Sequence, residues 1–214
     1  MGKLITVVGN SGVGKTTLAS KLCEIGSFIP FLEITEDRPF LQKFHDNRKG
    51  FCFANQVDFL LYQAEKEIFV RENDIVGVQD GGLDECFHVF TKRFRQKGYL
   101  DDEEFHSCER LYSILRLFLP SPDLMISLTA PYDVIAERMR KRGRDIDIER
   151  SQDLIELHKL IEKWLTNCTS VPAIHIDASQ DDPSFSSIID DLVSNGQRRV
   201  EEHKSFEQRF TNRS

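Results

Sequence analysis

The 214-residue chain is long enough for one well-buried domain, and its 40% hydrophobic and 29% charged residues are ordinary for a globular protein. The formal net charge of −7 argues against a surface that binds a nucleic-acid polymer. No apolar run is long enough to cross a bilayer, and a strand-like segment starts at Lys3, so we expect neither a signal peptide nor a membrane partner.

The cysteines indicate a reducing compartment. Their number is odd and no C-x-x-C pair occurs, which disfavours both a disulfide framework and a zinc site. We therefore expect a cytoplasmic protein with reduced thiols at Cys23, Cys52, Cys86, Cys108 and Cys168.

The segment GNSGVGKTT, residues 9–17, fits the pattern G-x-x-x-x-G-K-[ST] and is called the P-loop below. The apolar, β-branched KLITVV before it is typical of a buried strand, and TLASKLCEI after it has helical apolar spacing. A strand, a glycine loop and a helix start together indicate a phosphate site, because backbone N–H groups and the helix dipole converge there.

This loop predicts that the chain binds a nucleoside triphosphate with Mg²⁺. Lys15 would reach the β- and γ-phosphates, and the Thr16 hydroxyl would bind the metal. The predicted nucleotide-binding residues are Gly9, Asn10, Ser11, Gly12, Val13, Gly14, Lys15, Thr16 and Thr17.

Five buried strands are expected at residues 3–8, 28–34, 74–80, 123–130 and 171–179. Because they alternate with helical segments, they predict an α/β fold, a three-layer sandwich around a five-stranded parallel sheet. We expect one domain over residues 1–196 and a charged C-terminal tail over 197–214.

Helices are expected between these strands. One begins at Pro39 and is broken by Gly50, and the segment 83–119 should form two helices separated at Gly98. The other helical segments are 53–72, 131–144, 153–165 and 182–193.

Ligands of such sheets bind beyond the carboxyl ends of the strands, which places Glu33 and Asp80 in one cleft with the P-loop. Asp80 is the candidate second metal ligand, together with Thr16; its alternative role is to cap the following helix.

The class of P-loop protein follows from what accompanies the loop. The N-K-x-D motif of GTPases does not occur, and QDGG is a poor match to the Asp-Glu motif of AAA-type motors. A small-molecule kinase needs an arginine-rich lid over the phosphates, which Arg138, Arg142 and Arg144 provide in a predicted lid at about 138–149. The alternative is an exposed basic helix end.

From Lys3 to about Asp182 the chain resembles the deoxynucleoside kinase family, especially its compact bacterial members. The likeness is carried, in order, by the P-loop, LEITEDRPFLQKF, FANQVDFLL, LPSPDLMISLTAP, the RxxxRGR segment and EKWL. It implies a fold like that of P-loop nucleoside and nucleotide kinases, ATP as phosphoryl donor and a small-molecule acceptor.

The resemblance also implies roles for single residues. Glu33 would be the catalytic base that takes the proton of a 5′-hydroxyl, and Gln56 would bind the nucleobase through its amide. Asp80 would lie on the Mg²⁺ side, and Asp147 would contact the sugar 3′-hydroxyl. The lid arginines are Arg138 and Arg142, which would act in catalysis, and Arg144, which would bind the nucleotide.

The departures from the family lie on the acceptor side. Gly81 and Gly82 replace an arginine and a serine, and His45 stands where a sugar-contacting tyrosine is usual. Gln63 and Cys86 replace an arginine and an aspartate that pair in the family. Because removing only one member of that pair would strand a buried charge, the double loss indicates a rebuilt pocket.

Three hypotheses follow. The first is a kinase of the 5′-hydroxyl of a deoxynucleoside or a close analogue. The second is a P-loop kinase of another small alcohol or of a nucleoside monophosphate. The third is a non-catalytic, regulatory ATP-binding module. For this module, the aromatic-rich segment 87–100 is a candidate contact surface for a protein partner. Such a stripe also fits a core or the helix-pair dimer face typical of the resembled family, so a homodimer is the other partner considered.

Overall fold

The computed structural model describes residues 1–32, 38–141, 148–168 and 171–179, together with the positions 185, 189 and 192–194. Its five strands form one parallel sheet in the order β2-β3-β1-β4-β5, which confirms the predicted fold class. The strands are β1 (Lys3–Gly9), β2 (Ile29–Phe31), β3 (Val76–Asp80), β4 (Leu124–Thr129) and β5 (Ala173–Asp177).

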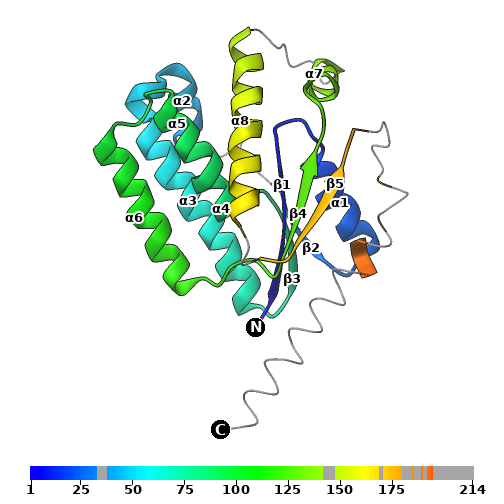
Figure 1. Ribbon diagram of the computed structural model, residues 1–214. Coiled ribbons are helices and arrows are strands. Elements are labelled where there is room, and N and C mark those ends of the chain that lie inside the picture. Colours follow the sequence, from blue (N-terminus) through cyan, green and yellow to red (C-terminus); the bar gives the residue numbers. More distant parts are fainter. Residues whose placement is uncertain are drawn as a thin grey trace.

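Helices cover both faces of this sheet (Figure 1). One group, with α3, α6 and α8, lies on one side, and α1 lies on the other. The helices are α1 (Lys15–Ile25), α2 (Leu41–Asp46), α3 (Arg48–Glu72), α4 (Leu83–Glu85), the π-helix η1 (Cys86–Thr91), α5 (Lys92–Gln96), α6 (Asp102–Phe118), α7 (Tyr132–Lys141) and α8 (Ile148–Asn167).

The central strand β1 packs against helices on both faces of the sheet. All seven of its residues are buried, as expected when helices cover both faces of a parallel strand. Ile5 and Val7 belong to the core that includes residues of α1, whereas Val8 packs in the cluster with Ile161 and Trp164 of α8. Side chains that alternate across one strand therefore build two separate cores.

Strand β2 is shorter than expected, because only Ile29–Phe31 pair with β3 in the described chain. It lies at the edge of the sheet, where Pro30 is tolerated because proline has no N–H to donate to a ladder. The predicted end of this strand, with Glu33, lies outside the described residues.

The break expected at Gly50 is wrong. Helix α3 begins at Arg48 and runs through Gly50, whose N–H donates to the Asn47 side chain at 3.0 Å. A glycine in the first turn of a helix is harmless when a good cap fixes that turn, so the cap overrides the propensity of Gly50.

The predicted separation at Gly98 is confirmed, but the segment before it is not a simple α-helix. Instead α4, η1 and α5 follow one another over Leu83–Gln96, with a π-helical stretch at Cys86–Thr91. After Gly98, α6 begins with a capping box in which Asp101 and Glu104 bond each other's backbone N–H groups.

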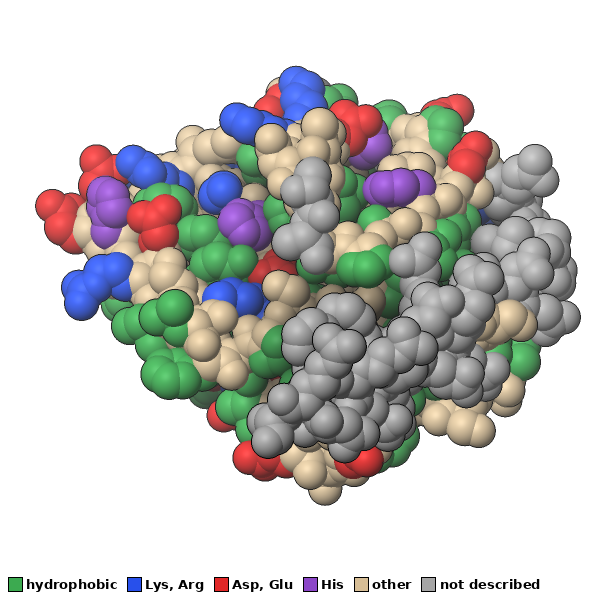
Figure 2. All heavy atoms as spheres, turned by 60° about the horizontal axis from the view of Figure 1, so that its bottom comes forward, with side chains coloured by type: hydrophobic (Ala, Val, Ile, Leu, Met, Phe, Trp, Pro, Cys, Tyr) green, Lys and Arg blue, Asp and Glu red, His purple; other side chains and the backbone are tan. Residues whose placement is uncertain are grey.

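Within the described residues, no helix combines the length and the apolar character that a bilayer crossing requires. On the face shown in Figure 2, basic and acidic side chains are interspersed with apolar patches, so this face is not a continuous basic surface. Most of the predicted closing helix 182–193 and all of the tail 197–214 lie outside the described residues.

Candidate functional site

The P-loop joins the end of β1 to the start of α1. Gly12 adopts φ +82°, and a Cβ built there would lie 2.8 Å from Met139 Cγ of α7. Only glycine fits such a backbone at so close an approach. The Lys15 ammonium donates to the carbonyl oxygens of Gly9 at 2.9 Å and Asn10 at 3.3 Å, so it lies over the loop and not in solvent.

Two predicted nucleotide-binding residues have their side chains engaged inside the protein. Asn10 donates to the Leu154 carbonyl of α8 at 2.8 Å and accepts from the Ser11 N–H at 2.8 Å. Val13 is fully buried. These residues can therefore offer a phosphate their backbone, while their side chains hold the loop in shape.

Asp80 lies beside Thr16, as expected of a metal site. The Thr16 hydroxyl donates to Asp80 Oδ2, while Oδ1 is buried and has no hydrogen-bond partner in the described part of the chain. The alternative role of Asp80 as a helix cap is wrong, since α4 is capped by Gly82 with no side-chain bond.

These groups fit Mg²⁺. A carboxylate oxygen and a hydroxyl are the hard ligands that this ion prefers, and it usually keeps waters and substrate phosphates as its other ligands. Nowhere among the described residues do three His, Cys, Asp or Glu side chains gather as a metal cage. A bound ion would thus be held by Thr16, Asp80 and the phosphates, and it would neutralise phosphate charge.

Glu85 is a site residue that no motif reveals. Its buried carboxylate accepts the Gly9 N–H at 2.9 Å, which ties α4 to the first residue of the P-loop. A Cβ at Gly81, whose φ is +75°, would lie 3.1 Å from Glu85 Oε2. The glycine that replaces the family's arginine thus lies against a carboxylate. The sequence shows two acidic residues, Asp84 and Glu85, shortly after Asp80, and no pattern distinguishes which of them bonds the P-loop.

On the acceptor side, Gln56 is buried in α3 and its side-chain carbonyl accepts the Thr91 hydroxyl at 2.9 Å. That contact fixes the amide, so the NH₂ group has a defined direction. His45, the other predicted acceptor residue, is exposed on α2, and its ring lies 5.8 Å from the Phe44 ring. The structure therefore does not place His45 in the buried network around Gln56.

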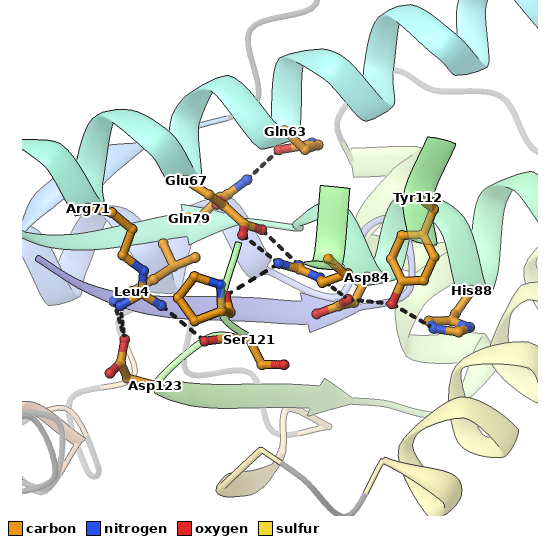
Figure 3. A network of polar contacts seen from close by, with 12 residues as sticks. Leu4, Gln63, Glu67, Arg71, Gln79, Asp84, His88, Tyr112, Ser121 and Asp123 are labelled. Carbon is orange, nitrogen blue, oxygen red and sulfur yellow. Dashed lines mark hydrogen bonds and ion pairs between the residues drawn. The ribbon is translucent and has the colours of Figure 1, made fainter. Parts of the chain in front are cut away.

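Neutral groups occupy the two positions where the family has a charged pair. The Gln79 amide donates to Gln63 Oε1 at 2.5 Å, and Cys86 is buried (Figure 3 shows Gln63 and Gln79). The protein thus buries no unpaired charge at either position. This agrees with the expectation that the arginine and the aspartate of the family were lost together.

Of the lid residues, Arg138 is described. Its guanidinium donates to the Val13 carbonyl at 3.3 Å, which places the last turn of α7 against the P-loop. Glu33, Arg142, Arg144 and Asp147 lie outside the described residues, so their roles stay predictions.

A buried polar network supports the segment after Asp80 (Figure 3). Arg116 of α6 bonds Glu67 at 2.7 Å and Asp84 at 2.7 Å, and Asp84 also accepts the Tyr112 hydroxyl at 2.7 Å. Burial lowers the pKa of Arg116, but its bonds to Glu67 and Asp84 outweigh this and raise it. Arg116 therefore stays charged, while burial raises the pKa of its partner Glu67, and the network anchors α4 to α3 and α6.

A parallel sheet with this loop, this carboxylate and this arginine defines a P-loop phosphotransferase fold. The deoxynucleoside kinase family model matches residues 5–201. The chain therefore belongs to the deoxynucleoside kinase family: it is a kinase, and ATP is its phosphoryl donor.

Individual relatives agree. The chain is 27% identical over 199 residues to a deoxyadenosine/deoxycytidine kinase of Bacillus subtilis, covering 89% of this chain and 92% of that one. It is 30% identical over 183 residues to a deoxyadenosine kinase of Dictyostelium discoideum, covering 84% and 74%. A solved deoxyadenosine kinase from M. mycoides, with products dCMP and a flexible dCDP bound, has the same fold with a TM-score of 0.75, 23% identity and coverage of 89% and 99%.

Proposed function

We propose that this kinase transfers the γ-phosphoryl group of Mg²⁺·ATP to the 5′-hydroxyl of a deoxynucleoside. The observation that carries the proposal is the contact of Thr16 with Asp80 beside the P-loop, where the buried Asp80 Oδ1 has no hydrogen-bond partner among the described residues. Membership of the family supports the acceptor class.

In this reaction the new bond joins the acceptor oxygen to the γ-phosphorus, and the bond to the β,γ-bridging oxygen breaks as ADP leaves. Lys15 would exchange its present carbonyl partners for phosphate oxygens, and Arg138 would approach the same phosphates from α7. Glu33 is the predicted acceptor of the hydroxyl proton. Arg142 and Arg144 would complete the lid, and Asp147 would bind the sugar.

The glycine at position 81 supports a neutral acceptor. The Glu85 carboxylate lies against Gly9 and Gly81, where the family carries an arginine near the 5′-hydroxyl and the phosphates. A phosphate on the acceptor would lack the arginine as a partner there, because Gly81 supplies no cation in its place. This disfavours a nucleoside monophosphate as acceptor and favours a nucleoside.

A panel of acceptors with Mg²⁺·ATP tests the proposal. We expect turnover on at least one of deoxyadenosine, deoxycytidine, deoxyguanosine and thymidine, and much less on the matching 5′-monophosphates. Phosphorylation of the monophosphates alone, or of none of these compounds, would refute it. Mass spectrometry of the product gives the site of transfer.

Two variants separate metal binding from proton transfer. Glu33→Gln should lower kcat by about 10²- to 10⁴-fold with ATP binding retained, since a positioned base contributes that much. Asp80→Asn should lower kcat and also raise the Mg²⁺ concentration needed for half-maximal rate. An unchanged kcat in Glu33→Gln would refute the role of Glu33 as catalytic base. An unchanged Mg²⁺ dependence in Asp80→Asn would refute the role of Asp80 as a metal ligand.

We also propose a homodimer formed through α6, a single domain over residues 1–196 with a separate tail over 197–214, and a cytoplasmic location. The candidate surface at 87–100 is not supported, because its residues Phe87, Val89 and Leu100 are buried in the cores. The exposed apolar residues of α6 are Ile114, Leu117 and Phe118. The five cysteines form no disulfide, as a reducing compartment requires.

A further inference from the structure

A cavity of about 530 Å³ lies between the η1–α5 segment, α6 and the second half of α8. It is at the opposite end of α8 from the P-loop: Leu154 bonds Asn10, whereas Trp164 and Cys168 line the cavity. Ten helical residues separate Leu154 from Trp164, or about 15 Å along the axis. The cavity is therefore separate from the P-loop, and its volume is in the range of small-molecule pockets.

One wall of the cavity is an ordered chain of hydrogen bonds. The Lys92 ammonium lies 3.1 Å from His88 Nδ1. On the other side of the ring, His88 Nε2 lies 3.0 Å from the Tyr112 hydroxyl, which donates to Asp84 (Figure 3 shows these three residues). An ammonium cannot accept a hydrogen bond, so Nδ1 must accept and Nε2 must carry the proton of the neutral ring. Burial, then the Lys92 charge, lowers the pKa of His88 to about 4, which keeps the ring neutral.

An aromatic ring adjoins this wall. Trp164 lies nearly parallel to His88, with ring centroids 6.0 Å apart and an interplanar angle of 16°. Leu160 and Val171 extend the apolar surface on either side. The apolar surface is suited to a planar ring.

The charges of the cavity favour an anion. Arg116 pairs with both Glu67 and Asp84, which leaves one negative charge that Lys92 or Lys163 can balance, so the five groups together carry a net charge of about +1. The ammonium groups of Lys92 and Lys163 carry this surplus on the cavity lining. In a chain with a net charge of −7, this is a local cationic site.

The same short segment contacts both the cavity and the kinase site. Asp84 and His88 line the cavity, while the adjacent Glu85 bonds the P-loop and Thr91 bonds Gln56. A π-helix lies in this segment, and such irregular turns occur often at functional sites. A ligand that shifts the segment would therefore move groups that face both substrates.

From this geometry we propose that the cavity is a regulatory site for a small molecule that carries a planar ring and an anionic group. The ring packs on Trp164, and the anion is held by Lys92 and Lys163. Binding there changes the affinity of the kinase site through the Leu83–Gln96 segment. Binding of the molecule to the cavity does not depend on the proposed kinase function. Its regulatory effect rests on that function.

The chain has a single tryptophan, Trp164, so its fluorescence reports on this cavity directly. Phenyl phosphate is the probe, and it is titrated into the full-length protein with excitation of the indole alone. We expect a saturable change in emission. Inorganic phosphate alone and benzyl alcohol alone should bind about tenfold or more weakly, because each lacks half of the recognised group.

Lys163→Gln is the test variant, because Lys163 is exposed on α8 and its loss leaves the fold intact. Its dissociation constant for phenyl phosphate should rise about tenfold. Lys159→Gln is the matched control, since Lys159 is exposed on the same helix, pairs with Glu156 at 2.9 Å and does not line the cavity. No saturable signal, or equal affinity in both variants, would overturn the site.

The regulatory part is tested in the kinase assay. Phenyl phosphate should change the acceptor KM at least twofold in the wild type and in Lys159→Gln, with the effect moved to higher concentration in Lys163→Gln. Saturable binding with no change in any kinetic constant would overturn the coupling while the site stands. Failure of the proposed kinase function would instead appear as no turnover without the probe.

Discussion

His88 illustrates at the scale of one residue how burial makes stability depend on pH. Its neighbours are Lys92 on the same segment, Asp84 on α4, Tyr112 and Arg116 on α6, and Trp164 on α8. Its pKa is lowered from 6.5 to about 4, so the unfolded chain binds a proton that the folded chain does not between these values. The stabilisation is therefore complete above about pH 6.5 and is lost as the pH falls toward 4.

We expect the wild type to lose about 1 kcal/mol more stability than His88→Gln when the pH is lowered from 7 to 5, after discounting for the partial exposure of the ring. Urea unfolding of both proteins at the two pH values measures this difference. Equal losses in the two proteins would contradict the neutral, buried state of His88.

Gly81 gives a second prediction at this scale. Its φ of +75° is unfavourable for a side chain, and a Cβ there would lie 3.1 Å from Glu85 Oε2. Gly81→Ala should therefore destabilise the protein by about 1–2 kcal/mol. Gly82→Ala is the control, because the backbone at Gly82 is extended. Urea unfolding measures the free energy of unfolding of both variants. Equal stability of Gly81→Ala and Gly82→Ala would refute the backbone strain expected at position 81.

Residues with a motif were predictable, and residues without one were not. The P-loop pattern located Lys15 and Thr16, and the end of an apolar strand located Asp80, because these positions are set by short local sequence. Glu85 escaped prediction because its partner, Gly9, is 76 residues away along the chain. No local pattern records that two such residues meet.

At the scale of the element, the Leu83–Gln96 segment connects the two sides of the site. Thr91 is fully buried, and its hydroxyl donates to Gln56 at 2.9 Å and lies 3.0 Å from the Cys86 carbonyl. The pair with Gln56 joins η1 to α3. Removing the hydroxyl should therefore loosen the amide that is predicted to bind the acceptor base.

We expect Thr91→Val to raise the acceptor KM about 5- to 20-fold and to leave the ATP KM unchanged, since one lost hydrogen bond is worth about 1–2 kcal/mol. Steady-state kinetics with each substrate varied in turn measures both constants. Thr166→Val, on the exposed side of α8, is the control for the same substitution. An equal rise in both KM values would indicate general damage instead of a role for Gln56.

The π-helix in this element could not be predicted, because apolar spacing does not distinguish a π turn from an α turn over six residues. The error at Gly50 has a related cause. Propensity indicated a break, but the Asn47 side chain caps the first turn of α3 and outweighs it. Helices and strands were predictable where many residues repeat one apolar pattern. They were not predictable where a single contact sets the end or the type of a helix.

At the scale of the whole molecule, the alternation of apolar strands with helices was sufficient to predict the parallel sheet, since parallel strands need crossover helices. The strand order was not predicted, and it places β1 between β3 and β4. That order brings Thr16, which follows β1, next to Asp80 at the end of β3. The metal site is thus a consequence of topology.

The exposed face of α6 gives the last prediction. Leu117 and Phe118 are 80% and 82% exposed, and Ile114 beside them is 49% exposed. Such apolar residues at i, i+3 and i+4 on one helix favour contact with a second copy of the chain. Tyr112 and Arg116 point from α6 into the protein, so a dimer through this face would leave the cavity beside them open.

Leu117→Glu with Phe118→Glu should weaken the dimer on the order of 100-fold, because two large apolar side chains are lost and like charges face each other across the two-fold axis. Sedimentation over a range of protein concentrations measures the dissociation constant. Ile25→Glu is the control, since it adds the same charge at a half-exposed apolar residue on α1, on the other side of the sheet (Figure 1). A wild type that stays monomeric at all concentrations, or a dimer as sensitive to Ile25→Glu, would refute the proposed interface, because the interface depends on the apolar row of α6.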